Sequence, residues 1–455
     1  MGSVEKTNGN RGAILAKFLI CSLIGIFMFF VPIRFGGFYV FERFVAEQNT
    51  IPLEHLVRVI RAAVGPFQRY VVLTIMVLGT LWTFVNGSWK KDTMAVIFTV
   101  FKVLGVVLAT MFIWEWGPEI FFQPATSAAG GMLPFLFNAL AMNLAFLIPI
   151  GALFLAFLTN YGLMEFIGTF LQPVMRKVLR TPGRSAVDAV ASLLGSYSVS
   201  LLITDKLYQE GRYNKREAVI IGIGFATVSV PFMIVIATNL QLMDRWLFFF
   251  WTSLLVTFLV TAISSRIPPI STISTDYYEG ATPKPEEVIK TKRFQTAYGD
   301  AMEAAARSGN VLVGIWESLK AGFRMTAITI TTILSIGLLG LLITEYTPIF
   351  DWIGYIFFPF AWLVQVPEAL LASQALATGI AEMFLPIPFV TEAPLATRYV
   401  VGVSAISAVV FFSAKIPCVL STKIPVSVPK MVMIWVIRVI LSILISGLIA
   451  LIFLR

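Results

Sequence analysis

The sequence predicts an all-α membrane protein with many transmembrane helices. Of its 455 residues, 58% are hydrophobic and only 13% are charged, whereas soluble domains carry about 25% charged residues. Its mean hydropathy is +0.85. Apolar runs of about 18–25 residues recur along the chain, and each is long enough to cross roughly 30 Å of hydrocarbon. These observations outweigh the chain length, which alone would suggest two or three soluble domains.

We expect nine spans and one interfacial helix. The run at 13–33 lacks a small-residue cleavage site at its end, so we expect a retained span there. Residues 52–67 separate apolar from charged side chains, which predicts an amphipathic helix lying in the membrane interface. His55 falls on its polar face, where we expect a solvated or headgroup-level imidazole. The remaining spans are expected at 69–86, 94–115, 133–158, 219–240, 246–264, 325–346, 399–414 and 431–454.

The net charge of +9 comes from basic residues grouped in short loops beside apolar runs. This distribution is typical of cytoplasmic loops and does not indicate a nucleic-acid partner. The basic turn at 89–92 and the basic N-terminus agree in placing the N-terminus in the cytoplasm. The polar stretch 266–310 is then a cytoplasmic linker, with an amphipathic helix around 300–307. Lys415, at the inner end of a span, is expected to extend toward the interface.

Two regions, 160–218 and 348–398, are interrupted by proline and glycine, and neither contains a full span. They resemble each other: the order acid–aromatic–Ile–Gly occurs at 165–168 and 351–354, each followed by a proline five residues after the glycine. With a small gap, Glu210 and Arg216 align with Glu392 and Arg398, and structural anchoring is the favoured role of these pairs. If the interrupted segments enter and leave on one face, three spans separate equivalent points. An odd number turns one copy upside down, which is the inverted repeat of many secondary transporters.

This repeat predicts four parts of the chain. Residues 1–132 are N-terminal transmembrane and amphipathic helices, 133–264 are the first repeat, 265–310 are the linker, and 311–455 are the second repeat. Each repeat is expected to contain a broken or re-entrant hairpin. Whether these segments re-enter or cross stays open.

We expect the tips of the two hairpins to bind a solute, because non-helical backbone at membrane depth persists only in protein or beside a wet cavity. Glu382 in the second tip would cost about 2.5–3.5 kcal/mol on insertion scales, so a role in contacting solute or carrying a coupling proton is favoured. A position at the aqueous rim of a shallow hairpin is the alternative. The serines of the first tip could equally pack against neighbouring helices, and Asp188 could pair with Arg184 on a helix surface. The candidate substrate-binding residues are Gly195, Ser196, Tyr197, Ser198 and Asp188 in the first hairpin, and Gln374, Thr378, Gly379 and Glu382 in the second.

Residue sets for catalysis or metal binding are missing from the sequence. Cys21 and Cys418 are the only cysteines and His55 is the only histidine, which supports no Cys/His metal site. The sequence contains no phosphate-binding loop and no nucleophile–base pair. We therefore expect no enzyme activity, no cofactor and no bound metal, with energy supplied by a proton or sodium gradient or by a partner.

The doubled region and the segment 379–386, Gly-Ile-Ala-Glu-Met-Phe-Leu-Pro, resemble the YjiH family. Its members contain the "nucleoside recognition" or Gate domain, which is related to parts of concentrative nucleoside transporters, the FeoB ferrous-iron permease and spore-maturation membrane proteins. The resemblance covers about residues 130–450. It implies two Gate repeats, a bacterial inner-membrane location and solute transport, and it leaves a homo-oligomer open. The scarcity of Cys and His in the spans argues against ferrous iron as the transported solute.

The expected function is secondary transport of a small polar or zwitterionic organic solute, such as a nucleoside, amino acid or dipeptide, by gradient-driven alternating access. The alternative is a non-transporting membrane assembly or signalling protein, similar to the spore-maturation relatives. A transporter should show a wet cavity lined by Glu382 and the serines. A scaffold should pack the tips dry.

Overall fold

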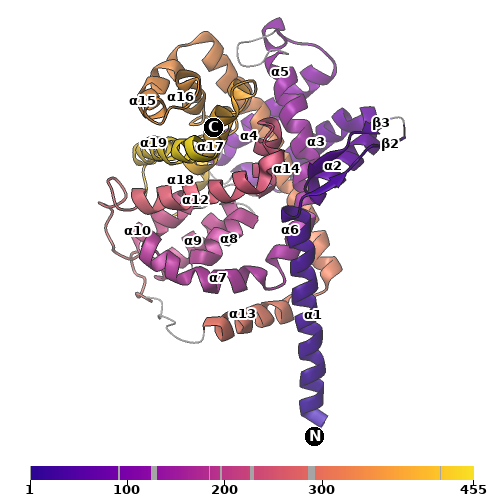
Figure 1. The fold of residues 1–455 in the computed structure, drawn as a ribbon, viewed down its shortest axis with the longest axis vertical. Helices are drawn as coiled ribbons and strands as arrows, with labels where there is room; N and C mark the ends of the chain where they lie inside the picture. Colours follow the sequence, from indigo (N-terminus) through magenta and orange to yellow (C-terminus); the bar gives the residue numbers. More distant parts are fainter. Residues whose placement is uncertain are drawn as a thin grey trace.

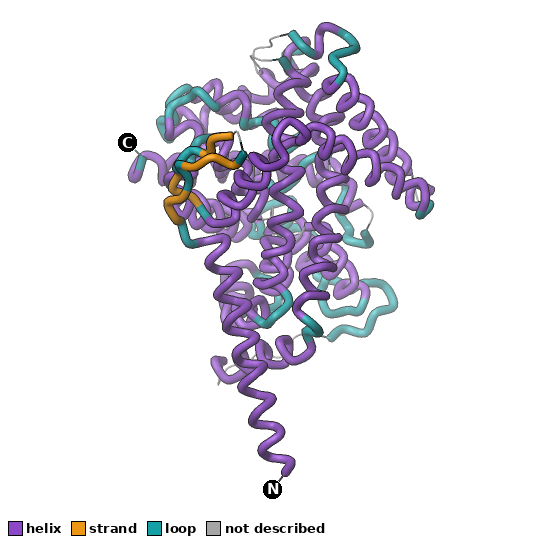
Figure 2. The backbone as a smooth tube through the Cα atoms, turned by 90° about the vertical axis from the view of Figure 1, so that its right-hand side faces the viewer, coloured by secondary structure: helices purple, strands orange, loops and turns teal. Residues whose placement is uncertain are grey.

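The protein is described from a computed structural model, which describes residues 2–41, 43–90, 93–123, 131–183, 185–194, 197–225, 230–284, 293–413, 415–420 and 422–454. Most of these residues are helical and the strands are few and short, which confirms the all-α class. Helix α1 (Gly2–Phe30) projects from the body with the N-terminus at its free end (Figure 1). Seen from the side, the short strands lie together in one small patch (Figure 2).

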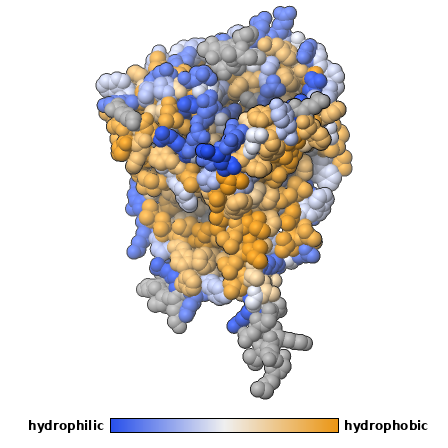
Figure 3. Space-filling view, turned by 45° about the vertical axis from the view of Figure 1, so that its right-hand side comes forward, coloured by the Kyte–Doolittle hydropathy of each residue, from blue (hydrophilic) through white to orange (hydrophobic). Residues whose placement is uncertain are grey.

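Eight helical stretches of the described chain are long and apolar enough to cross a membrane. They are Arg11–Phe30, Pro52–Val85, Ala95–Ile113, Met132–Leu158, Lys215–Asn239, Met243–Ser264, Val311–Tyr346 and Val428–Phe453. Figure 3 shows that apolar side chains cover much of the molecular surface between more polar ends, as a bilayer requires. The chain is thus a multi-pass membrane protein.

The helices that build these stretches are α2 (Pro52–Val64), α3 (Gln68–Val85), α4 (Thr93–Ile113), α5 (Met132–Phe135), α6 (Met142–Thr159), α10 (Lys215–Val219), α11 (Val230–Asn239), α12 (Trp246–Ser264), α14 (Val311–Tyr346) and α19 (Val428–Phe453). Short turns of other helix types interrupt or join them at η1 (Gly65–Phe67), η2 (Ser88–Lys90), η3 (Glu119–Phe121), η4 (Leu136–Ala141), η6 (Ile220–Phe225) and η7 (Met243–Arg245). Of these, η4 and η6 are π-helical. Such local widening is often found at functional positions.

The ninth expected span, 399–414, is wrong. Helix α17 (Leu395–Ala408) has only 14 residues and ends at Val409, whose φ is 63°. Beyond it the backbone leaves the helix and pairs with a distant loop: the Phe412 N–H donates to the Ile380 carbonyl at 2.8 Å, and the Ser413 N–H to the Ala381 carbonyl at 3.0 Å. These bonds satisfy backbone groups that an unbroken helix would have satisfied internally. The chain then forms α18 (Lys415–Leu420).

The amphipathic helix expected at 52–67 forms as α2, but part of its charged face is covered, and its position in the membrane interface stays a prediction. Helix α2 ends at Gly65, separate from α3. His55 is only 3% exposed; its Nε2 lies 2.9 Å from the Ile33 carbonyl oxygen and its ring meets the Phe35 ring edge-on. The expectation of a solvated imidazole is therefore wrong.

Four short strands between α1 and α2 provide this cover. Strand β1 (Ile33–Phe35) pairs antiparallel with β4 (Gln48–Thr50), and β2 (Phe38–Val40) pairs antiparallel with β3 (Arg43–Val45). Strands β2 and β3 pack against α2. Strands of three residues are too short to show an alternation of apolar and polar side chains, so they could not be predicted from the sequence.

Both interrupted regions fold into short helices, and none of these helices is a full span. The first region contains α7 (Leu163–Val174), η5 (Met175–Leu179), α8 (Ser185–Leu194) and α9 (Tyr197–Gln209). The second contains α15 (Ile349–Leu363), α16 (Ala369–Thr378) and η8 (Pro388–Val390). Helix α7 packs on α8, and α15 packs on α16, so each region forms a helical hairpin. The inversion of one copy relative to the other stays a prediction.

The linker contains the expected amphipathic helix, α13 (Arg293–Arg307), which is longer than 300–307. Its buried face consists of Ala297, Ala301 and Ala305. It packs on α7 and α1. The Thr169 hydroxyl of α7 donates to Asp300 at 2.8 Å, so the linker is fastened to the first hairpin.

Replacing Asp300 with Ala should loosen this attachment. The Thr169 hydroxyl would lose its acceptor, and a hydrogen bond to a charged group contributes about 1.5–3 kcal/mol; at this partly buried position we expect about 1 kcal/mol. Hydrogen exchange of the α13 amides should accelerate about fivefold, while exchange in α19 stays unchanged. Equal acceleration in both helices would point to global destabilisation instead.

Candidate functional site

The loop after α16 places Glu382 inside the protein. Glu382 is 5% exposed, and its carboxylate accepts the backbone N–H of Phe384 at 2.5 Å. The carbonyls of the two preceding residues, Ile380 and Ala381, accept the bonds from the break after α17. Glu382 is therefore held at the point where the second hairpin meets that break, and not at an aqueous rim.

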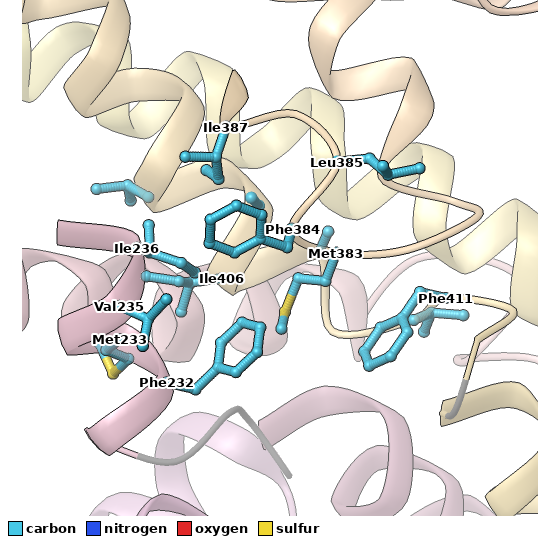
Figure 4. Close-up of a cluster of buried hydrophobic side chains, with 14 of the residues drawn as sticks. Phe232, Met233, Val235, Ile236, Met383, Phe384, Leu385, Ile387, Ile406 and Phe411 are labelled. Carbon is cyan, nitrogen blue, oxygen red and sulfur yellow. The ribbon is translucent and has the colours of Figure 1, made fainter. Parts of the chain in front are cut away.

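Apolar side chains surround this loop. Met383 and Phe384 lie among the side chains of α11 and of the break, including Phe232 and Phe411 (Figure 4). The Phe232 and Phe384 rings meet edge-on, with centroids 6.2 Å apart. The cavity beside Gly379 and Met383 measures about 10 Å³, at the lower limit for one water molecule. Among the described residues the second tip is therefore packed dry. The side chains of Ser196 and Ser198 lie outside the described part, so the cavity lined by Glu382 and the serines stays a prediction.

The other candidates of the second hairpin lie on α16 or at its end. Gln374 is half-buried, and its backbone touches α15 at Gly354, where an added Cβ would lie 2.8 Å from the Gln374 Cα. Thr378 is buried, and its hydroxyl donates to the Ala375 carbonyl of its own helix at 2.7 Å. Gly379 directly follows α16 and lines the small cavity. These three residues and Glu382 are thus brought close together along one short segment.

In the first hairpin, Gly195 and Ser196 lie outside the described residues. Tyr197 and Ser198 open α9, and their side chains are also outside the described part.

Asp188, in α8, is 1% exposed and accepts the hydroxyl hydrogen of Tyr213 at 2.7 Å. Asp188 therefore does not lie on an exposed helix surface, and its proposed pair with Arg184 stays a prediction because Arg184 lies outside the described residues. The Ser200 hydroxyl of α9 donates to the Asp188 carbonyl at 3.0 Å, which joins the two helices of the hairpin.

The break after α17 connects the two hairpins. On one side its backbone pairs with the loop that carries Glu382. On the other side α18, which follows the break, packs on α9 of the first hairpin. The Lys423 N–H also donates to Asp205 of α9 at 2.8 Å.

Lys415 begins α18 and is 1% exposed. The expectation that it extends to the membrane interface is wrong, because the residues just before it are bonded to the buried loop at Ile380 and Ala381.

Arg438 was not identified from the sequence as a candidate functional residue. It is fully buried in the last span, α19, and its Nε and Nη2 donate to the Ser407 carbonyl at 2.9 and 2.7 Å. Its Nη1 donates to the Thr261 hydroxyl at 3.0 Å, and that oxygen lies 2.7 Å from the Gly224 carbonyl oxygen. Ser407 is the next-to-last residue of α17, and Gly224 is in the last turn of η6. A single arginine inside a 26-residue apolar helix was the signal that could have identified it.

The aligned arginines Arg216 and Arg398 act as anchors. The Arg216 Nε donates to the Ile273 carbonyl at 2.8 Å, and the Arg398 Nη1 donates to the Leu240 carbonyl at 2.8 Å. Each arginine therefore ties the start of a broken helix to backbone in another part of the chain. These bonds support a structural role for the two arginines, and the anchoring of the glutamate–arginine pairs at the membrane interface stays a prediction.

Comparison with known proteins gives matches along the whole chain. Residues 141–243 match the Gate family, described as nucleoside recognition. An uncharacterized protein of Alkalihalophilus pseudofirmus is 32% identical over 440 residues, covering 94% of this chain and 92% of that protein.

Among solved structures, the chain is similar to CNTnw in an inward-facing substrate-bound state, with 15% identity, 97% and 91% coverage of the two chains, and a TM-score of 0.39. It is also similar to a CNTnw variant in the intermediate 1 state, with 14% identity, 96% and 92% coverage, and a TM-score of 0.42.

Proposed function

Because this chain contains a nucleoside recognition (Gate) match at residues 141–243 and belongs to the same family as the uncharacterized protein of Alkalihalophilus pseudofirmus, we propose that it is a secondary transporter and not an enzyme. Its solute would be a small polar or zwitterionic organic molecule, such as a nucleoside, an amino acid or a dipeptide. A proton or sodium gradient would drive alternating access in the bacterial inner membrane.

The observation that carries this proposal is the pairing of the α17 break with the loop of Glu382. Interrupted backbone and buried charge both carry a free-energy cost in a membrane, which continuous apolar helices would avoid. Here they converge: the break begins at Val409, Lys415 follows it, and Arg438 binds the carbonyl of Ser407 just before it. A purely structural assembly needs no such arrangement, so its presence supports transport over the scaffold alternative.

The loop of Glu382 at the second tip is packed dry, so transport requires that this loop separate from the break after α17 to admit a solute. Two backbone bonds, from Phe412 and Ser413, hold the loop of Glu382 against the break. Their separation would uncover Glu382 together with the carbonyls of Ile380 and Ala381, which offers a polar surface to a solute. In this proposal the structure corresponds to a closed state of the cycle.

A thermal-shift screen of the purified protein against nucleosides, amino acids and dipeptides tests the proposal. A solute at 100 times its Kd should stabilise the folded state by about 2.7 kcal/mol. Glu382→Gln retains an acceptor for the Phe384 N–H but removes the charge, so we expect at least tenfold weaker binding. Glu392→Gln, the same change at an exposed position, should leave binding unchanged.

The outcomes separate the two parts of the proposal. A solute that stabilises wild type and Glu382→Gln equally would show that the site is placed wrongly, while transport would stand. If no solute stabilises the protein and none is taken up by vesicles that contain it, the assembly alternative is favoured.

A further inference from the structure

A groove of about 920 Å³ runs along the flank of the protein between α3, α4 and α14. Its wall is mostly apolar, and several of its large side chains are exposed. They include Phe67, Leu78, Trp82, Phe323 and Ile328. On a membrane-spanning face such side chains meet lipid acyl chains rather than water.

One end of the groove is cationic. Lys102 of α4 and Arg324 of α14 both line it, beside Thr83, Asn86 and Ser88. The Lys102 Nζ donates to the Thr83 hydroxyl at 3.0 Å, which fixes the ammonium near the end of α3.

Arg324 lies at the same height as Thr83. Helices α3 and α14 touch at Gly79 and Ala327, where a Cβ on Gly79 would lie 2.2 Å from that of Ala327. Thr83 follows Gly79 by four residues and Arg324 precedes Ala327 by three. Since the two helices run in opposite directions by the expected topology, Arg324 and Thr83 lie about 4.5 and 6 Å along their helices from this contact, on the same side.

No carboxylate lines the groove among the described residues. Glu317, an earlier residue of α14, pairs instead with Lys320 at 2.7 Å. The turn after α3 carries Lys90, and α14 begins directly after the linker, so the cationic end belongs to the cytoplasmic side by the positive-inside rule. The cytoplasmic leaflet is the one whose anionic lipids attract such basic positions.

We propose that this groove binds an anionic phospholipid of the cytoplasmic leaflet. Lys102 and Arg324 hold the phosphate, because a guanidinium and an ammonium offer charged donors that match phosphate oxygens. One acyl chain lies along the apolar wall of α3, from Trp82 toward Phe67. Asn86 and Ser88 contact the polar part of the headgroup.

Native mass spectrometry of the full-length protein tests this site. The purified protein is mixed with equal amounts of phosphatidylglycerol and phosphatidylcholine, and the retained lipids are counted. Wild type should retain phosphatidylglycerol in preference. Arg324→Gln should weaken this preference about fivefold, and the double variant Lys102→Gln, Arg324→Gln about twenty-fivefold, since each cation near an anionic surface contributes about that factor.

Lys320→Gln provides the matched control, because it removes one positive charge from the same helix outside the groove. It should keep the wild-type preference. Arg324 is exposed, so its single variant keeps the fold even if Lys102→Gln does not. The proposal would be overturned if wild type retained the two lipids equally, or if Arg324→Gln kept the wild-type preference for phosphatidylglycerol. It would also be overturned if Lys320→Gln lost as much of this preference as Arg324→Gln.

Discussion

Arg438→Ala is expected to destabilise the protein by about 3–5 kcal/mol. The substitution leaves the buried Ser407 carbonyl without its two guanidinium donors, which costs about 1–3 kcal/mol, and removes the hydrogen bond that the Thr261 hydroxyl accepts. The lost side-chain volume adds a cavity at a fully buried position. Unfolding of purified protein, titrated with denaturing detergent and followed by tryptophan fluorescence, measures the change.

Other substitutions separate the contributions of the charge, the hydrogen bonds and the burial of Arg438. Arg438→Lys keeps a charge that can reach one acceptor, so it should lose about half as much stability. Arg34→Ala, which removes an exposed arginine paired with Glu47, should stay within about 0.5 kcal/mol of wild type. If Arg438→Met proved more stable than wild type, desolvation of the guanidinium would outweigh its hydrogen bonds, contrary to this prediction.

Gly354→Val is expected to separate the two helices of the second hairpin. A Cβ at this position would lie 2.8 Å from the Gln374 Cα and 3.0 Å from its backbone nitrogen. Because backbone atoms cannot rotate away as a side chain can, the helices must move apart, and overpacking of this kind costs about 1–3 kcal/mol. We expect a lower unfolding midpoint, with faster hydrogen exchange in α15 and α16 than in α12.

A glycine in open surroundings provides the control. No heavy atom lies within 4 Å of a Cβ built on Gly299, in the middle of α13. Gly299→Ala should therefore be neutral or stabilise by up to about 1 kcal/mol through helix propensity. Equal destabilisation by both substitutions would show that the close contact at Gly354 is not the cause.

Local patterns in the sequence were enough for the membrane class and for much of the layout. Eight of the nine expected spans are present, because an apolar run of 18 or more residues is decided by its own composition. The interrupted regions were recognisable for a similar reason: proline and glycine act on the backbone where they stand, as at Pro173 and Pro359. The amphipathic helices α2 and α13 followed from the spacing of their apolar side chains.

Tertiary contacts decided which polar groups are buried. His55 was expected in water or among lipid headgroups because its helix has a charged face, yet the strands that precede the helix cover that residue. Lys415 was expected at the interface, yet its neighbours are bonded to a loop more than thirty residues earlier. In the candidate site, the sequence singled out Glu382 but not Arg438, although both are ionisable residues among apolar ones.

Hydropathy by itself therefore determined which segments of this protein lie in the membrane, since the free energy of transfer into lipid is a sum over each segment's own side chains. The tertiary structure decided where the helix in the run at 399–414 stops. The run is largely apolar, and its composition predicted a span; the helix ends before Val409, and the backbone of Phe412 and Ser413 finds partners at Ile380 and Ala381. A backbone group in a membrane must have a partner, and only the fold determines whether that partner lies four residues away or in another hairpin.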